Sequence, residues 1–316
     1  MASRLISVVV PVFSEAETLE ALAGEIRQVA EQSDLDLQTV FVDDGSRDES
    51  WSRIVALANA DPSIGGLRFR KNAGKAAALM AGFAAAQGEI VFTMDADLQD
   101  PPAEMPRFIE KIDAGFDLVS GWKRRRHDPW HKVYPSKVFN WMIRLLTRVP
   151  LHDHACGFKC FRRDLVGQLR LYGELHRFLG VLAAAKGYRV TEISTLHRPR
   201  TRGVGKYGFT RFFKGFLDLL TVWFLARYRW RPQHVIGVAG LLTILLNLVL
   251  AVIAWLDSSI LTALLAPVLI VWSGFTLIAI GLVAELIVAD RPIDDLYVIS
   301  ERVGWCCERT GHERRP

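Results

Sequence analysis

The feature that most constrains the fold is an alternation of two hydrophobic patterns along the first 125 residues. Short runs rich in β-branched residues alternate with stretches in which apolar residues recur every three or four positions. The expected strands are LISVVVPV (5–12), LQTVFVDDGS (37–46), GGLRFR (65–70), EIVFTMDAD (89–97) and DLVSG (117–121). The expected helices cover residues 16–32, 48–59, 75–87 and 103–115. Strands that alternate with helices predict a mostly parallel, Rossmann-like sheet with helices on both faces.

Two of the expected strands end in acidic residues. Asp43 and Asp44 close the second strand, and Asp95 and Asp97 close the fourth. Ligands of open α/β sheets bind beyond the carboxyl ends of the strands, so functional acids are expected at these positions. The sequence DDGS alone is equally compatible with a tight turn, because Asp and Gly favour turns. Two acidic strand ends in one sheet favour a functional site.

The acidic end of the fourth strand predicts a cation. Side chains alternate along an extended chain, so Asp95 and Asp97 lie on the same side, and Gln99 continues the spacing if the chain stays extended. Buried carboxylates are costly unless a cation meets them. Hard oxygen ligands suit Mg²⁺ or Mn²⁺, which also share phosphate oxygens. The pattern therefore predicts a divalent metal that holds a diphosphate.

The second half of the chain carries two long apolar segments, 235–256 and 260–289, separated by the sequence DSS. Each is long enough to cross a hydrocarbon core of about 30 Å, so they predict a two-helix transmembrane hairpin. The tip of the hairpin has no Lys or Arg, whereas both flanks are basic. The positive-inside rule then predicts an integral inner or plasma membrane protein with both termini in the cytoplasm.

The predicted organisation has four parts. These are a cytoplasmic globular domain (1–209), an amphipathic juxtamembrane region (210–233), the two membrane helices (234–289) and a cytoplasmic tail (290–316). The juxtamembrane segment and the basic, Trp-containing stretch 127–149 both suit helices that lie in the membrane interface. For the stretch 127–149, packing on the globular domain is an equal alternative.

The chain has a formal net charge of +5, and its basic residues are clustered, as in the run from Lys123 to Arg126. Basic clusters beside a membrane segment indicate anionic lipid headgroups or a phosphate ligand. No nucleic-acid motif accompanies the charge, so we expect no nucleic-acid partner.

Six motifs that cover nearly all of residues 5–233 carry a family resemblance. They are VVVPVFSEAETL (8–19), VFVDDGSRDES (40–50), the stretch from NAGK to DADLQDPP (72–102), DHACGFKCFRRDL (153–165), GELHRFLGVLAAAKGYRV (173–190) and HRPRTRGVGKYG (197–208). Together they resemble the GT-A-fold family 2 glycosyltransferases, and within them the polyprenyl-phosphate glycosyltransferases of the dolichol-phosphate mannose synthase and bactoprenol glucosyltransferase types. This resemblance implies a GT-A catalytic domain followed by interfacial helices and a transmembrane hairpin.

The resemblance also implies a reaction and a donor site. The reaction is inverting, metal-dependent transfer of a hexose from a UDP- or GDP-sugar to a polyprenyl phosphate lipid at the cytoplasmic membrane face. The implied nucleotide-sugar ligands are Pro11, Phe13, Glu15, Asp44, Lys75 and Asp95. Asp97 and Gln99 would hold Mg²⁺ or Mn²⁺. Phe13 stands where the family has Tyr, which keeps base stacking but removes a hydroxyl.

The implied acceptor-phosphate ligands are Lys123, Lys132, Ser136, Arg202 and Lys206. Lys123 and Lys132 stand at positions implied to be Arg, so they keep the charge and lose the bidentate fork. A phosphate monoester is already largely dianionic near pH 7, so a lipid phosphate needs cations more than a strong base. Catalysis is expected from Asp97 and Lys123, and from Asp153 if a carboxylate assists. A structural role for Asp153 in its turn is an equal alternative.

Two other functions compete with this one. A processive polysaccharide synthase would have a Q-x-x-R-W motif and more membrane helices, but Arg229–Trp230 lacks the preceding Gln. A non-catalytic membrane adaptor that keeps a nucleotide-binding fold is disfavoured by the intact acids and Lys206. The hairpin is also compatible with a homo-oligomer.

Overall fold

The computed structural model describes residues 4–124, 130–198, 210–228, 231–256, 258–290 and 296–307. Within the helices, the side chains at 130–135, at 210–214 and at several positions between 233 and 277 lie outside this description. The chain forms two compact units. One comprises residues 1–218 with 292–316, and the other comprises residues 219–291.

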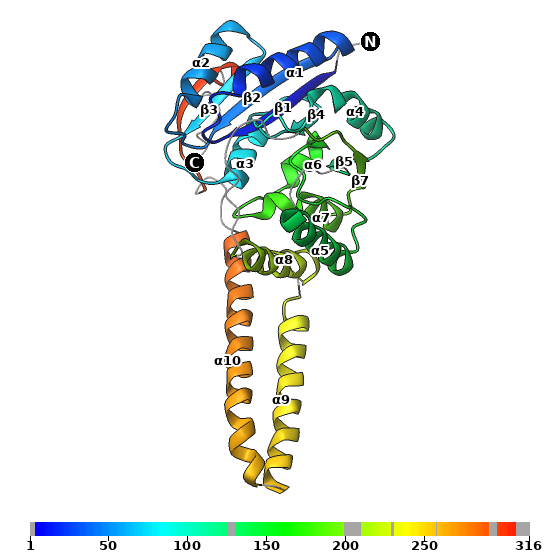
Figure 1. The fold of residues 1–316 in the computed structure, drawn as a ribbon, viewed down its shortest axis with the longest axis vertical. Helices are drawn as coiled ribbons and strands as arrows, with labels where there is room; N and C mark the ends of the chain where they lie inside the picture. Colours follow the sequence, from blue (N-terminus) through cyan, green and yellow to red (C-terminus); the bar gives the residue numbers. More distant parts are fainter. Residues whose placement is uncertain are drawn as a thin grey trace. The chain divides into compact units, whose positions relative to one another are not determined.

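The first unit contains an eight-stranded sheet with the order β7-β5-β6-β4-β1-β2-β3-β8 (Figure 1). The strands are β1 (Leu5–Val12), β2 (Asp36–Asp43), β3 (Ile64–Phe69), β4 (Ile90–Thr93), β5 (Leu118–Trp122), β6 (Lys159–Arg162), β7 (Val190–Ser194) and β8 (Ile299–Gly304). Among these described strands, four pairings are parallel and three, which involve β6 and β8, are antiparallel. The predicted α/β sheet is confirmed, but it is mixed.

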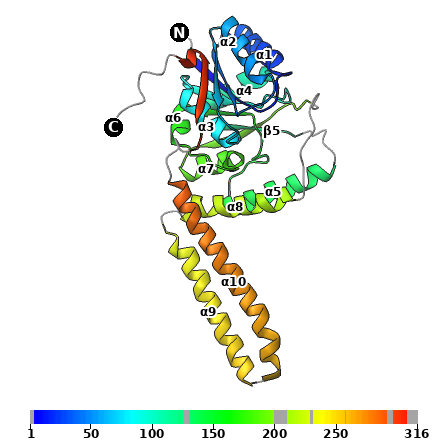
Figure 2. The ribbon, with the colours of Figure 1, turned by 90° about the vertical axis from the view of Figure 1, so that its left-hand side faces the viewer.

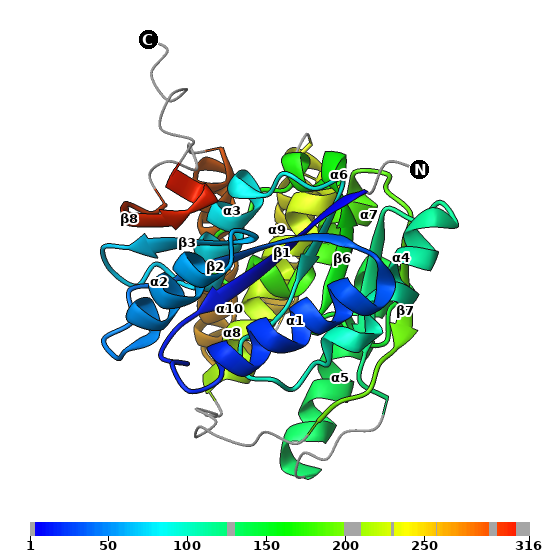
Figure 3. The same cartoon turned by 90° about the horizontal axis from the view of Figure 1, so that it is seen from above.

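Helices cover both faces of this sheet. They are α1 (Leu19–Ser33), α2 (Ser50–Ala60), α3 (Lys75–Ala85), α4 (Met105–Asp113), α5 (Trp130–Thr147), α6 (Arg163–Gln168) and α7 (Leu179–Ala185), with 3-10 turns η1 (Pro102–Glu104) and η2 (Leu175–Phe178). Figure 3 shows α1 and α2 on one side of the central strands and α3 and α6 on the other. The helices predicted at 16–32, 48–59, 75–87 and 103–115 are therefore confirmed.

The core follows from the alternation along β1. Val8 points to the face that α1 covers, where it joins Leu22 and Ile26 in one buried cluster. Val9 points to the opposite face, because neighbouring side chains in a strand alternate. On that face Gly82 of α3 lets the helix approach closely, since a Cβ at this position would overlap Val9. Buried layers on both faces fix the strand ends that carry the acidic residues.

The second unit contains two long helices that lie side by side, α9 (Gln233–Leu256) and α10 (Ser258–Ala289) (Figure 2). They match the two apolar segments, so the predicted helices are confirmed. No helix in the described part of the chain is long and apolar enough to cross a bilayer. Spanning of the membrane therefore stays a prediction.

The segment 290–316, expected to be a tail, contains part of the sheet. Its residues from Ile299 to Gly304 form β8, which pairs antiparallel with β3 at the sheet edge. The sequence pattern did not predict this strand. Helix α8 (Thr210–Tyr228) contains residues of both units, and it agrees with the helix expected from residue 210.

Candidate active site

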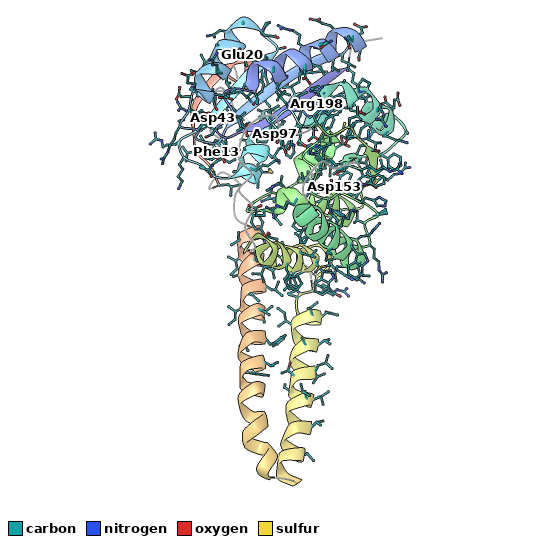
Figure 4. All side chains as sticks on the ribbon, in the orientation of Figure 1. Phe13, Glu20, Asp43, Asp97, Asp153 and Arg198 are labelled. Carbon is teal, nitrogen blue, oxygen red and sulfur yellow. The ribbon has the colours of Figure 1, made fainter. Side chains whose placement is uncertain are left out.

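The acidic strand ends meet at one edge of the sheet. Strand β1 lies between β2 and β4 and is parallel to both, so the loops that follow these three strands leave the sheet together. Pro11 and Val12 close β1, and Val12 pairs with Asp43 at the end of β2. Figure 4 shows Phe13, Asp43 and Asp97 at this same edge. The site that the sequence predicts is therefore assembled from separate strands.

The loop after β1 is held against the loop after β2. The backbone N–H of Ser14 donates to Ser46 Oγ at 3.0 Å, and that of Glu15 donates to Ser50 Oγ at 3.1 Å. Ser14 has a φ of 59°, an uncommon left-handed conformation for a residue with a side chain. The Phe13 ring next to it is 46% exposed, so one face is available for stacking on a base.

Asp44 is buried and supports the start of α3. Its carboxylate accepts the N–H of Ala73 at 2.6 Å and the N–H of Gly74 at 2.9 Å. Burial raises the pKa of Asp44, although these two donors act in the opposite direction. An ionised carboxylate offers about four acceptor positions, so a nucleobase contact is compatible with both bonds. The nucleobase role itself stays a prediction.

Asp95 is ion-paired with Lys75, the first residue of α3. Burial works against ionisation of Asp95, but the Lys75 ammonium outweighs it and lowers the pKa of Asp95 to about 2. Gly157 lies against the Asp95 carboxylate, where a Cβ would overlap it. The Gly157 carbonyl accepts the Thr93 hydroxyl at 2.8 Å, which fixes this close approach. Two predicted nucleotide ligands thus form one charged pair beside the strand end.

Asp97 and Gln99 fit a divalent cation. Burial and the Asp95 carboxylate raise the pKa of Asp97. A bound cation would counteract both effects, because it favours the ionised form of the carboxylate. Gln99 is fixed by its side-chain amide, which donates to the Arg198 carbonyl at 3.3 Å. Within the described residues, no group of three or more His, Cys, Asp or Glu is arranged to hold a metal. Mg²⁺ commonly takes one or two carboxylates and completes its shell with phosphate oxygens and water, so a site that relies on the substrate is expected.

Lys123 is held by a carboxylate that the sequence analysis did not assign. Its ammonium lies 2.9 Å from Asp100, and the two side chains are 14% and 1% exposed. His197 Nδ1 approaches the same carboxylate at 3.7 Å. Burial opposes the charge of Lys123, but Cys156, Asp100 and Asp95 around it raise its pKa. Lys123 is therefore a fixed cation at the edge of the site.

The remaining implied acceptor residues are Ser136, Lys132, Arg202 and Lys206. Ser136 lies in α5 and is partly buried. The Lys132 side chain and the residues Arg202 and Lys206 lie outside the described residues. Asp153 is almost fully buried, and Figure 4 shows it away from Asp97. This burial favours the structural alternative for Asp153.

His176 is a further polar residue close to the donor site, and the sequence analysis gave it no role. Burial, followed by the nearby Lys75 and Arg177, lowers the pKa of His176 to about 3, so its imidazole is neutral near pH 7. Only at the low pH where Asp95 titrates is His176 protonated, and its charge then also lowers the pKa of Asp95. The motif GELHRF contained His176, but the sequence carried no signal that η2 brings it beside α3.

Gly157→Ala is expected to weaken nucleotide-sugar binding. The added methyl group would displace the Asp95 carboxylate from Lys75, and misplacement of about 1 Å can cost about 100-fold in rate. We expect a rise of about 10- to 100-fold in the KM for the sugar donor, measured by initial rates. Gly167→Ala is the matched control, because a Cβ there meets nothing within 4 Å. Equal KM values for the two variants would contradict the close contact.

The family described as Glycosyl transferase family 2 matches residues 7–170, which is more than half of the chain. The chain belongs to glycosyltransferase family 2. It is therefore an enzyme, and the matched region contains the Lys75–Asp95 pair, Asp97, Gln99 and Lys123.

Relatives of the polyprenyl-phosphate type match almost the whole chain, which confirms the resemblance seen in the motifs. Dodecaprenyl-phosphate galacturonate synthase of Rhizobium johnstonii is 33% identical over 308 residues, covering 92% of this chain and 89% of the relative. Undecaprenyl-phosphate 4-deoxy-4-formamido-L-arabinose transferase of Proteus mirabilis is 34% identical over 288 residues, covering 89% and 88%.

Solved structures support the GT-A fold. Glucosyl-3-phosphoglycerate synthase of Mycobacterium tuberculosis, in complex with Mn²⁺, UDP-glucose and phosphoglyceric acid, superposes with a TM-score of 0.56. The identity is 21%, and the match covers 70% of this chain and 80% of that structure. At this identity the likeness establishes the fold alone.

Proposed function

We propose that the protein is an inverting glycosyltransferase that moves a sugar from a UDP- or GDP-sugar to a polyprenyl phosphate at the cytoplasmic membrane face, with Mg²⁺ or Mn²⁺. One observation carries the proposal. Two ion pairs, Lys75–Asp95 and Lys123–Asp100, lie at the strand edge that also presents Asp97. The relatives named for transfer to polyprenyl phosphates support the acceptor.

The donor half explains how a nucleotide diphosphate would be held. Phe13 offers an exposed ring to the base, and Lys75 offers a cation beside Asp95. Asp97 and Gln99 would hold the metal, which supplies positive charge to the leaving diphosphate. The sugars named for the relatives differ from one another, so transfer of a hexose stays a prediction.

The acceptor half explains why no strong base is required. A lipid phosphate is already an anionic nucleophile near pH 7, so the site needs to orient it and to balance its charge. Lys123 is suited to this role because Asp100 fixes its ammonium. Inversion follows if the phosphate attacks the anomeric carbon once, from the side opposite the leaving diphosphate. Lys132, Ser136, Arg202 and Lys206 are proposed to complete this phosphate site.

Membrane attachment is proposed from the full sequence of the apolar segments and from two structural observations. Strand β8 returns the chain to the sheet after the hairpin, so the regions before and after the hairpin belong to one unit. This arrangement requires an even number of membrane crossings. In addition, α5 exposes Val138, Trp141 and Leu145 at spacings of three and four, with Trp141 55% exposed. Such a stripe is typical of a helix in the membrane interface.

Metal affinity is expected to fall as the pH is lowered, starting at pH values where an ordinary aspartate is still ionised. The reason is the raised pKa of Asp97, because a proton then competes with the metal for this carboxylate. Calorimetric titration of Mn²⁺ into the full-length protein with UDP, repeated over a pH series, measures this effect. Gln99→Ala, which removes an oxygen that does not titrate, should lower the affinity by a constant factor. An affinity independent of pH would exclude Asp97 as the ligand.

Nucleotide release separates the proposal from its rivals. Purified full-length protein is incubated with nucleotide sugars, with and without Mn²⁺ and polyprenyl phosphate. Release of nucleoside diphosphate that requires both additions supports transfer to the lipid. Release without the lipid, together with a growing sugar chain, indicates a processive synthase, and absence of release with every donor indicates an adaptor.

A further inference from the structure

The strand after the hairpin is seated specifically on the nucleotide-binding half of the sheet. Figure 3 shows β8 beside β3, and the register runs from Gly65 opposite Gly304 to Phe69 opposite Ile299. Trp305 Nε1 donates to the Ser63 carbonyl at 3.2 Å, just beyond the end of the strand. These contacts set the register of β8 against β3.

Glu301 of β8 reaches across to two residues of the catalytic unit. One carboxylate oxygen accepts Arg68 Nη1 at 2.7 Å, and the other accepts Trp51 Nε1 at 2.9 Å. Arg68 also lies over the Trp51 ring, 5.8 Å from its centroid. The bonds from Arg68 and then from Trp51 lower the pKa of Glu301. Although Glu301 is 51% exposed, it is tied at both oxygens.

Arg68 connects this contact to the interior. Its Nε lies 3.4 Å from Oδ2 of Asp43, a carboxylate with no exposed surface. The other oxygen of Asp43 accepts the backbone N–H of Ser46 at 3.0 Å. Asp43 therefore closes the turn from 43 to 46, and Arg68 balances its buried charge. Asp44 lies within this turn, and Ser46 also holds the loop of Phe13.

We propose that Glu301 is a positioning residue for nucleotide binding. Strand β8 places Glu301 on Arg68, Arg68 is thereby directed onto Asp43, and Asp43 fixes the turn that presents Asp44 and supports Phe13. The segment that follows the membrane hairpin thus completes the donor site without contacting the nucleotide. This inference rests on the proposed nucleotide role of that turn. It implies that substitutions of Glu301 weaken binding of the sugar donor and leave binding of the lipid acceptor unchanged.

The test compares Glu301→Ala, Glu301→Gln and the control Arg302→Ala in the full-length protein. Arg302 is the next residue of β8, so its loss tests for general damage to the strand. UDP and GDP affinities are measured by calorimetry, and KM values for the sugar donor and for polyprenyl phosphate are measured separately. Glu301→Ala is expected to raise the nucleotide Kd and donor KM by about 3- to 30-fold, with kcat and the lipid KM unchanged. Glu301→Gln should be weaker in effect, because it keeps an acceptor for Trp51.

The outcomes are distinct. Unchanged nucleotide affinity in Glu301→Ala, or an equal effect in Arg302→Ala, overturns the positioning role. So does a loss of kcat and lipid affinity in parallel with nucleotide affinity, which indicates general destabilisation. The variant Asp44→Asn tests the proposed donor site itself. If it leaves nucleotide affinity unchanged, the proposed donor site is wrong. If it lowers affinity while Glu301→Ala does not, only the inference about β8 fails.

Discussion

Asp97→Asn is expected to abolish sugar transfer, with a loss of at least about 100-fold in kcat, while the fold stays intact. The substitution keeps the size of the side chain and removes the charge that would hold the divalent cation. The pKa of Asp97 is raised by burial and by Asp95, so the ionised form of this side chain destabilises the folded protein. Removal of its charge should therefore leave the melting temperature unchanged or slightly higher. Initial rates and thermal melts measure the two effects.

A matched control for this prediction is Asp36→Asn, which neutralises an exposed aspartate at the start of β2. It should retain full activity. Turnover of Asp97→Asn at the rate of the unmodified enzyme would exclude the metal role of Asp97. Lost activity accompanied by a lower melting temperature would show that the residue is structural.

Lys123→Met is expected to give the second large effect, a loss of about 100-fold or more in kcat/KM for the lipid phosphate. It should also lower the free energy of unfolding by about 3–5 kcal/mol, because Asp100 would be left buried without its partner. The double variant Lys123→Met with Asp100→Asn removes both charges. It should regain most of the stability and none of the activity.

These single and double variants distinguish a catalytic role of Lys123 from a role in folding. Chemical denaturation gives the stability of the single and double variants, and initial rates at varied lipid concentrations give kcat/KM. Lys123→Arg keeps the positive charge and should retain substantial activity. Recovery of activity in the double variant would show that Lys123 serves only to neutralise Asp100.

The central part of the fold could be predicted from the sequence because its signals are local. The apolar spacing in α1 predicts a helix, and the β-branched run in β1 predicts a strand. Each pattern also indicates which residues are buried. The acids at the ends of β2 and β4 then fall at one edge, since β1 is parallel to both. The helices α9 and α10 were equally clear from composition.

The antiparallel strands could not be predicted in the same way. Strand β6 has only four residues, too few to show a period, and it lies between β4 and β5 in the sheet. Strand β8 pairs with a strand more than 200 residues earlier, and nothing local identifies that partner. Removal of everything after residue 233 would delete β8 together with the hairpin. A truncated domain would therefore lose Glu301 as well as the proposed membrane anchor.

The sequence also did not indicate which residues form ion pairs with the site residues. The types and order of Asp95, Asp97 and Gln99 indicated metal and phosphate chemistry. The pairing of Lys75 with Asp95 and of Lys123 with Asp100 depends on how β5 and α3 pack around β4. Asp100 lies in the motif DADLQDPP, but only the assembled sheet shows that it holds Lys123.

The most direct measurement is the mass of the lipid product. Full-length enzyme is incubated with Mn²⁺, a polyprenyl phosphate and a panel of UDP- and GDP-sugars, and the lipid is analysed by mass spectrometry. We expect a polyprenyl phosphate that gains one sugar residue, with no product when the metal is omitted or when the Asp97→Asn variant is used in place of the unmodified enzyme. A lipid that carries a growing series of sugars, or an unchanged lipid with every donor while nucleotide is released, would contradict this expectation.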